Sequence, residues 1–215
     1  RGRKVRLNRG LRISVYNRDP CHCRLQRLNS STMRVLCRPV VSQDLPTVVT
    51  LDHRCFGGLW SEAAYMREMG SPNSDLWVLE VMATPRSPSR LSGIGCVWAI
   101  LEEAHLTLLG IEPAQQGQGL GQWLLIELLR AAIARGLTRA TLEVRPTNHR
   151  ALTLYKKYGF SVAGERRHYY PDGESALILW QQSLQAPSLV ATLQHQQVRL
   201  CQRYQLTSSP LSRPH

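Results

Sequence analysis

Residues 116–124 read Gln-Gly-Gln-Gly-Leu-Gly-Gln-Trp-Leu, and this glycine-rich turn decides how the rest of the chain is interpreted. An apolar stretch at 105–111 precedes the turn, and an amphipathic stretch over 119–135 follows it. Glycine leaves backbone N–H groups unobstructed and permits positive φ angles. A helix that begins here adds unpaired N–H donors and a partial positive charge, which together suit a pyrophosphate. The sequence therefore predicts a strand, a phosphate-binding turn and a helix, although glycines are also common at ordinary helix ends.

Two better-known phosphate motifs do not fit this turn. A P-loop ends in Gly-Lys-Ser/Thr, whereas Gly121 is followed by Gln122 and Trp123. A dinucleotide fingerprint needs G-x-G-x-x-G in a βαβ unit near the start of the fold. The spacing here is G-x-G-x-G, and several strand-like stretches precede it.

The hydrophobic periodicity predicts the element order β-α-α-β-β-β-α-β-α-β-β. Ser42 and Ser61 are placed to cap the first two helices. Several consecutive strands before one central helix favour a mixed α/β fold with a mostly antiparallel central sheet flanked by helices, rather than a doubly wound sheet. We expect strands at 35–40, 76–82, 93–101, 105–111, 140–144, 160–166 and 175–180, and helices at 42–55, 62–69, 119–135 and 147–158. A further helix is expected within 187–205.

The charge of the chain is concentrated at its start. The formal net charge is +12, and residues 1–32 contain nine Lys or Arg against one acid, Asp19. We interpret 1–32 as a basic, disordered leader, because such charge runs usually stay solvated. Two alternatives stay open: translation upstream of Met33, and an organelle transit peptide.

Compartment and metal content are inferred from what the sequence lacks. No apolar run approaches the roughly 18 residues of a membrane span, and we find no secretory signal. We therefore expect a cytoplasmic chain, or one in an organelle matrix or stroma if the leader is a transit peptide. Cys21-His22-Cys23 has no second ligand pair at zinc spacing, so no metal is expected. Cys37, Cys55 and Cys96 lie in apolar surroundings and should be small buried hydrophobic residues.

At this point a resemblance becomes specific. The order strand, Gln-x-x-Gly-x-Gly, helix is similar to the acetyl-CoA pyrophosphate motif of the GNAT acetyltransferases, matched here by Gln116, Gly119 and Gly121. Residues 33–182 resemble the ribosomal-protein-alanine acetyltransferases (the RimI family) within that superfamily, most strongly over 109–180. The further matching positions are Asp44-Leu45, Leu51-Asp52, Phe56, Trp60-Ser61, Leu142 to Arg145, Asn148, Ala151, Leu154-Tyr155, Gly159-Phe160, Arg167, Tyr169-Tyr170, Glu174 and Ala176.

The resemblance implies a GNAT fold at 33–182, with 183–215 as a C-terminal extension that holds a helix and then a disordered tail. It implies acetyl-CoA as cosubstrate and direct transfer of acetyl to an amine. The expected acceptor is the N-terminal alanine of a small-subunit ribosomal protein. We expect a monomer whose core binds neither nucleic acid nor membrane.

Two residues are candidates for proton transfer. Glu143 ends an apolar strand, and burial of a carboxylate should raise its pKa towards that of a useful base. The resemblance places the general base at Glu143, while an ion pair with Arg145 or another neighbour is the structural alternative. It also implies that Tyr155 protonates the departing thiolate; otherwise Tyr155 is a packing residue on its helix.

Binding roles follow from the same resemblance. It implies that the backbone N–H of Ile111 stabilises the oxyanion. Asn148 is either a helix cap or a cofactor contact. The residues expected to bind acetyl-CoA are Leu109, Ile111, Gln116, Gly117, Gln118, Gly119, Leu120, Gly121, Asn148 and Tyr155. The residues expected to bind the acceptor are Trp60, Tyr169, Tyr170 and Glu174.

The sequence departs from the family at two places. Many relatives carry Arg inside the turn where this chain has Gly117 and Gln118, so the phosphates lose charge partners unless Lys156 and Lys157 compensate. Ser175 stands where the family often has Asp, which puts recognition of the amine in question.

Other functions stay open on the sequence alone. The acceptor could instead be a lysine side chain or a small-molecule amine, or the chain could bind acetyl-CoA without catalysis. A nucleic-acid-binding protein is a third possibility, although the positive charge lies in the leader.

Overall fold

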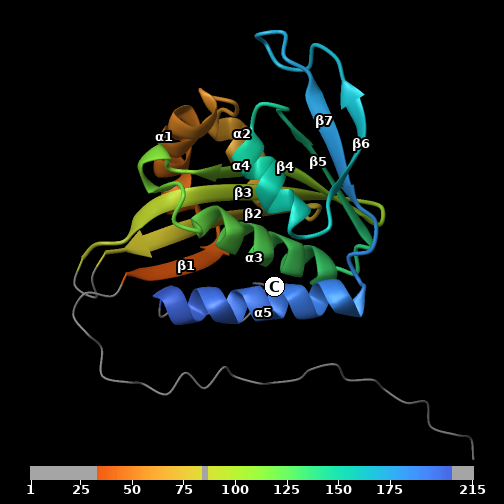
Figure 1. The fold of residues 1–215 in the computed structure, drawn as a ribbon. Helices are drawn as coiled ribbons and strands as arrows, with labels where there is room; N and C mark the ends of the chain where they lie inside the picture. Colours follow the sequence, from red (N-terminus) through yellow and green to blue (C-terminus); the bar gives the residue numbers. More distant parts are fainter. Residues whose placement is uncertain (1–32, 84–86, 205–215) are drawn as a thin grey trace, which may run out of the picture.

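The computed structural model describes residues 33–83 and 87–204, so the expectations for the 1–32 leader and for the end of the tail lie outside the described residues. The described elements follow the predicted order, with one more helix after the last strand (Figure 1). The strands are β1 (Arg34–Pro39), β2 (Ser74–Met82), β3 (Arg90–Ile100), β4 (Glu103–Ile111), β5 (Arg139–Val144), β6 (Ser161–Arg166) and β7 (Ala176–Gln181). The helices are α1 (Leu45–Phe56), α2 (Glu62–Gly70), α3 (Leu120–Ala134), α4 (His149–Lys156) and α5 (Pro187–Tyr204), and short 3-10 helices span Ser42–Asp44 and Pro113–Gln115.

One seven-stranded sheet organises the described part of the chain, in the order β1-β2-β3-β4-β5-β7-β6. Every neighbouring pair is antiparallel except β4 with β5, which is parallel. The predicted mixed α/β fold with a mostly antiparallel sheet is therefore confirmed. Figure 1 shows β5, β6 and β7 leaning away from the plane of the other strands.

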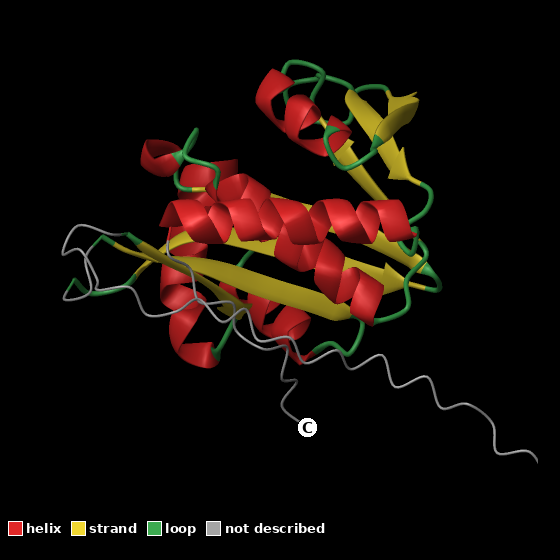
Figure 2. Cartoon of the chain, turned by 60° about the horizontal axis from the view of Figure 1, so that its bottom comes forward, coloured by secondary structure: helices red, strands yellow, loops and turns green. Residues whose placement is uncertain are grey.

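Helices cover both faces of the sheet (Figure 2). α1 and α2 pack on one face around Leu51 and Tyr65, both of which are fully buried. α3 packs on the other face, where Leu124 and Leu128 are also fully buried. Gly95 in β3 permits this close approach, since a Cβ there would lie 2.6 Å from Cδ1 of Leu128.

α5 lies beneath α3 and shares its core. Leu189, Leu193, Leu200 and Tyr204 are buried in the same apolar cluster as α3. A predicted helix within 187–205 is thus confirmed, and its amphipathic face packs against the rest of the protein. No helix of the described part of the chain is long and apolar enough to span a membrane.

Several predicted helix ends are confirmed, and one is wrong. Ser61 accepts a hydrogen bond from the backbone N–H of Ala64 at 3.3 Å, as a cap should. Ser42 caps nothing; a 3-10 turn begins there, and Asp44 accepts a hydrogen bond from the Val41 N–H at 2.9 Å. The carboxylate two residues later takes the place of the predicted hydroxyl, because Asp44 is held in position by Arg38 at 2.6 Å.

Candidate active site

The site is built where β4 and β5 stop pairing. Their parallel register ends at Leu106 opposite Leu142, although both strands continue beyond it. On the other edge of β4, the N–H of Glu112 donates to the carbonyl of Ser92 in β3 at 2.8 Å. Because N–H directions alternate along a strand, the N–H groups two residues apart at 109 and 111 point away from β3 and into the opening.

The glycine turn closes one end of this opening. Gly117 and Gly119 have φ angles of +79° and +93°, the left-handed region in which glycine has no steric penalty. Gly119 is the residue that caps α3. The side-chain amide of Gln116 donates to the carbonyl of Ile111 at 3.1 Å and so ties the turn to the end of β4. The predicted strand, turn and helix are confirmed, and within the described part of the chain nothing beyond its two neighbours comes within 4 Å of a Cβ built on Gly117.

Two other residues expected to bind acetyl-CoA have structural contacts of their own. The Leu120 side chain is buried in the core, which leaves its backbone N–H as the group near a ligand. The Asn148 side-chain oxygen accepts from the N–H of Ala151 at 3.1 Å, so Asn148 caps α4.

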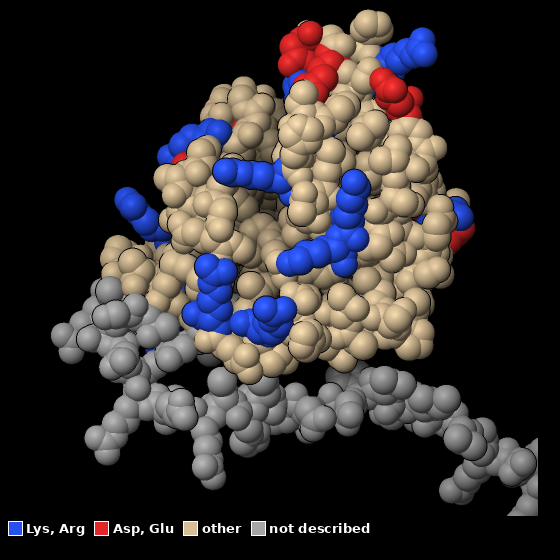
Figure 3. Space-filling view, viewed as in Figure 1, with Lys and Arg blue, Asp and Glu red and all other residues tan. Residues whose placement is uncertain are grey.

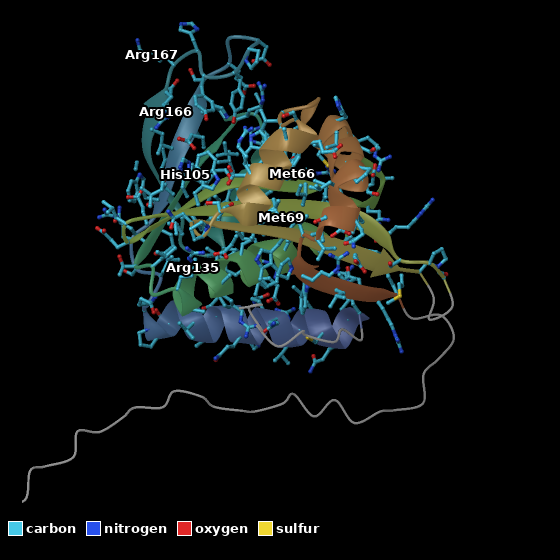
Figure 4. The ribbon with its side chains drawn as sticks, turned by 180° about the vertical axis from the view of Figure 1, so that it is seen from behind. Met66, Met69, His105, Arg135, Arg166 and Arg167 are labelled. Atoms are coloured by element: carbon cyan, nitrogen blue, oxygen red, sulfur yellow. The ribbon has the colours of Figure 1, made fainter. Side chains whose placement is uncertain are left out.

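Glu143 forms the polar centre of the opening. Its Oε2 lies 2.7 Å from Nε2 of His105, and its Oε1 lies 3.4 Å from Nη2 of Arg166. The carboxylate side chain is 9% exposed. Figure 4 shows His105 within the sheet and Arg166 beyond it towards the end of the β6–β7 hairpin, with Arg167 farther out.

The predicted rise in the pKa of Glu143 is wrong. The hydrogen bond from His105 lowers the pKa most, the charges of His105 and Arg166 lower it further, and burial opposes them without prevailing. The structural alternative of an ion pair is met by another neighbour, Arg166, whereas Arg145 binds Asp172 at 2.8 Å. Glu143 is therefore a carboxylate held in its ionised form.

A ladder of aromatic rings connects this centre to the loop after α1. The rings of His105 and Trp98 meet edge to face, with centroids 6.2 Å apart. The rings of Trp98 and Trp60 are stacked, with centroids 6.1 Å apart. The predicted acceptor residue Trp60 is thus linked to Glu143 through two residues that the sequence did not single out.

Tyr155 lies on α4 and is almost completely buried, with 7% of its surface exposed. Burial raises the pKa of its phenol well above the ordinary value, and the nearby Tyr170 raises it further. The ring packs against Phe160 with centroids 5.7 Å apart. A phenol that stays protonated at neutral pH can donate its proton or a hydrogen bond, so this environment is compatible with the predicted role and with packing.

The β6–β7 hairpin forms the outer wall. The rings of Tyr169 and Tyr170 meet edge to face at 5.1 Å, and the guanidinium carbon of Arg145 lies 3.8 Å from the Tyr170 ring centroid. Glu174 receives hydrogen bonds from Arg145 and from the Thr147 hydroxyl, the latter at 2.7 Å. The Glu174 carboxylate therefore connects the hairpin to the segment between β5 and α4 through these hydrogen bonds.

The sequence missed three residues here: His105, Trp98 and Arg166. Each comes from a different element, and only the sheet register brings them together. The one available signal was the alternation of β4, which placed a polar His105 two residues before the equally polar Thr107 in an otherwise apolar strand. Among the residues that the structure describes, no three His, Cys, Asp or Glu side chains form a group suited to a metal ion.

Two features fit a ligand that carries a thioester at one end and phosphates at the other. Strand N–H groups and Glu143 lie at the opening, and an unobstructed glycine turn begins α3 nearby. These are features expected of an acetyltransferase. Residues 45–160 match the acetyltransferase (GNAT) family, and the chain belongs to that family.

Two proteins and one solved structure are similar to this chain over most of their own length. The chain is 31% identical over 140 residues to a "Putative [ribosomal protein bS18]-alanine N-acetyltransferase" of Bacillus subtilis, covering 64% of this chain and 89% of that protein. It is 32% identical over 139 residues to the "[Ribosomal protein bS18]-alanine N-acetyltransferase" of Escherichia coli, covering 63% and 89%. The crystal structure of the ribosomal-protein-S18-alanine N-acetyltransferase from Escherichia coli superposes with a TM-score of 0.60 at 29% identity, over 71% of this chain and 97% of that chain.

Proposed function

We propose that this acetyltransferase modifies a protein N-terminus, and that its acceptor is the N-terminal alanine of a small-subunit ribosomal protein. The observation that carries the proposal is the Glu143–His105 pair at the point where β4 and β5 separate. The names of the two relatives supply the acceptor, since both are called ribosomal-protein-alanine N-acetyltransferases.

An α-amine suits the charge state of Glu143. Such an amine titrates near pH 8, so about a tenth of it is neutral at pH 7, whereas a lysine side chain is almost entirely protonated. An ionised Glu143 attracts the ammonium form and then takes one proton from it. His105 positions the carboxylate, because its Nε2 lies 2.7 Å from Oε2.

The rest of the site supplies the groups that acyl transfer needs. Acetyl-CoA brings a thioester whose carbonyl carbon bonds to the amine nitrogen as the carbon–sulfur bond breaks. The Ile111 N–H stabilises negative charge on the carbonyl oxygen. Glu143 takes one of the two protons that the ammonium group loses, Tyr155 gives its proton to the departing sulfur, and the second proton from the nitrogen replaces the one lost by Tyr155, so protons balance.

The remaining candidates are given binding roles on the same basis. Gln116 holds the turn in shape through Ile111. The backbone groups of the turn (Gly117, Gln118, Gly119, Leu120 and Gly121) bind the phosphates, and Leu109 and Asn148 line the path between turn and thioester. Trp60, Tyr169 and Tyr170 flank the acceptor, while Glu174 holds their hairpin closed.

The test is acetylation of short peptides followed by mass spectrometry. The peptides begin with Ala, Ser or Met, and a fourth has a blocked N-terminus and an internal Lys. Acetyl on the α-amine of the Ala peptide supports the proposal. Transfer only to Lys or to a small amine would leave the family assignment intact and reject the acceptor. Binding of acetyl-CoA without any transfer would point to a non-catalytic binding protein.

A further inference from the structure

The last turn of α5 lies against the glycine turn. A Cβ built on Gly119 would lie 3.5 Å from Cδ2 of Leu200, 3.6 Å from Oη of Tyr204 and 3.9 Å from Nη1 of Arg203. Figure 1 shows the cause: α5 runs antiparallel to α3, so its C-terminal end reaches the start of α3. The residues that match the family end at 160, so α5 lies outside that segment.

Arg203 brings a positive charge to a turn that has none. Residues 116–122 contain no Lys or Arg. Lys157, which could have supplied such a charge, donates to the side chain of Gln122 at 3.0 Å. The Arg203 side chain is exposed and its guanidinium carbon lies 5.2 Å from the neighbouring Tyr204 ring; no ion pair is seen between it and any residue of 33–83 or 87–204. Figure 3 shows Lys and Arg side chains on the face that carries α3, α4 and α5.

Tyr204 adds a hydroxyl that lacks a partner. Its side chain is 7% exposed, and its Oη is buried with no hydrogen-bond partner in the described part of the chain. A buried phenol normally finds an acceptor, because leaving the group unpaired is unfavourable. Because the Tyr204 hydroxyl lies beside Gly119, an oxygen atom of a ligand bound at the glycine turn could accept its hydrogen bond.

We infer that α5 completes the phosphate site, with Arg203 and Tyr204 binding the pyrophosphate of acetyl-CoA alongside the backbone N–H groups of the turn. The guanidinium replaces, from a distant part of the chain, the arginine that the turn lacks. Both groups are hydrogen-bond donors, as a pyrophosphate requires. This inference rests on the use of acetyl-CoA in the proposed function.

The test uses the full chain and measures binding by calorimetry. The probes are CoA, 3′-dephospho-CoA, which keeps the pyrophosphate, and pantetheine, which has no phosphate. We expect Arg203→Gln to weaken CoA and dephospho-CoA equally, by about tenfold or more, because one charged hydrogen bond is lost. Pantetheine binding, measured by competition, should not change. Arg67→Gln is the matched control, since it removes the same charge from an exposed residue of α2 on the opposite face.

Tyr204→Phe tests the hydroxyl separately and keeps the ring that fills the core. We expect CoA binding to weaken by about threefold to tenfold, with the thermal unfolding midpoint no lower than in the unmodified chain. Removal of α5 is a poor test, because its buried leucines belong to the main core.

The outcomes separate the two ideas. Unchanged CoA binding by Arg203→Gln, in a chain that binds CoA, would overturn the α5 inference and leave the proposed function standing. A loss of CoA and dephospho-CoA that Arg67→Gln reproduces would also overturn it, since charge alone would be responsible. Failure of the unmodified chain to bind CoA would reject the proposed function and the inference with it.

Discussion

Nε2 of His105 lies 2.7 Å from Oε2 of Glu143, one residue away from the last paired residues of β4 and β5. The register explains this contact, since it pairs His105 with Thr141 and leaves Glu143 two positions farther along β5 on the same side. β4 and β5 therefore hold the His105–Glu143 pair at the point where the two strands separate. Chemistry at this opening depends on both strands.

Glu143→Gln should lower kcat/KM by about a hundredfold or more, because a positioned proton acceptor contributes roughly that much. Steady-state kinetics with the preferred peptide measure the loss. Glu165→Gln, which removes an exposed acid from β6, serves as the control and should keep full activity. Equal activity in the two variants would exclude Glu143 as the base.

His105→Ala should shift the acidic limb of the kcat/KM profile to higher pH. The His105 hydrogen bond is the largest effect that lowers the pKa of Glu143, so its loss lets burial raise that pKa. Below the new pKa the carboxylate is protonated and cannot accept a proton. His105→Gln retains an N–H donor and should restore part of the shift. A uniform loss of activity at all pH values would indicate a structural effect only.

Tyr155→Phe should reduce kcat by about tenfold to a hundredfold with little change in KM for the peptide, because a proton donor is lost while the packing remains. Tyr158→Phe is the matched control, as Tyr158 is also buried and lies just beyond α4. A variant of Tyr155 with unchanged kcat would assign this residue to packing.

Gly119→Ala and Gly121→Ala should differ in stability. Gly119 has a φ angle of +93°, where a Cβ costs about 1–2 kcal/mol. Gly121 is helical, and its added Cβ would meet Cγ1 of Ile111 at an ordinary 3.5 Å. We expect Gly121→Ala to be neutral or stabilising by up to about 1 kcal/mol. Urea unfolding measures the free energy of unfolding of both variants. An equal loss of stability in the two would contradict the assigned backbone conformations.

Arg38→Gln should destabilise the fold by about 3 kcal/mol at neutral pH, since it leaves partly buried carboxylates unpaired. Arg38 lowers the pKa of Asp44, chiefly through a hydrogen bond. The stabilisation from this pair is thus present above the unfolded pKa of about 3.9 and is lost as pH falls through the lower folded pKa. The difference between the unmodified chain and Arg38→Gln should shrink from pH 5 to pH 2. A difference that is constant with pH would show that Asp44 is not the partner that matters.

Local patterns were enough to predict the architecture. The element order, the helix after the glycine turn and the Ser61 cap depend on periodicity and on neighbours a few residues apart, which a sequence displays directly. Ser42 misled because Asp44, held by an ion pair with Arg38, accepts the hydrogen bond at this turn, and Arg38 is itself paired with Glu80 on another strand.

By itself, the sequence determined a glycine-rich turn between strand and helix, a mixed sheet, and Glu143 and Tyr155 as titratable side chains in apolar settings. Only the tertiary structure decided the environment of those groups. Strand pairing brings His105, 38 residues away in the chain, within hydrogen-bonding distance of Glu143, and the β6–β7 hairpin brings Arg166 within ion-pairing distance. Together they reverse the expected shift in the pKa of Glu143. Likewise, Arg203 reaches Gly119 because α5 packs along α3. Charge interactions fall off steeply with distance in space and do not depend on separation in sequence, so these effects required the fold.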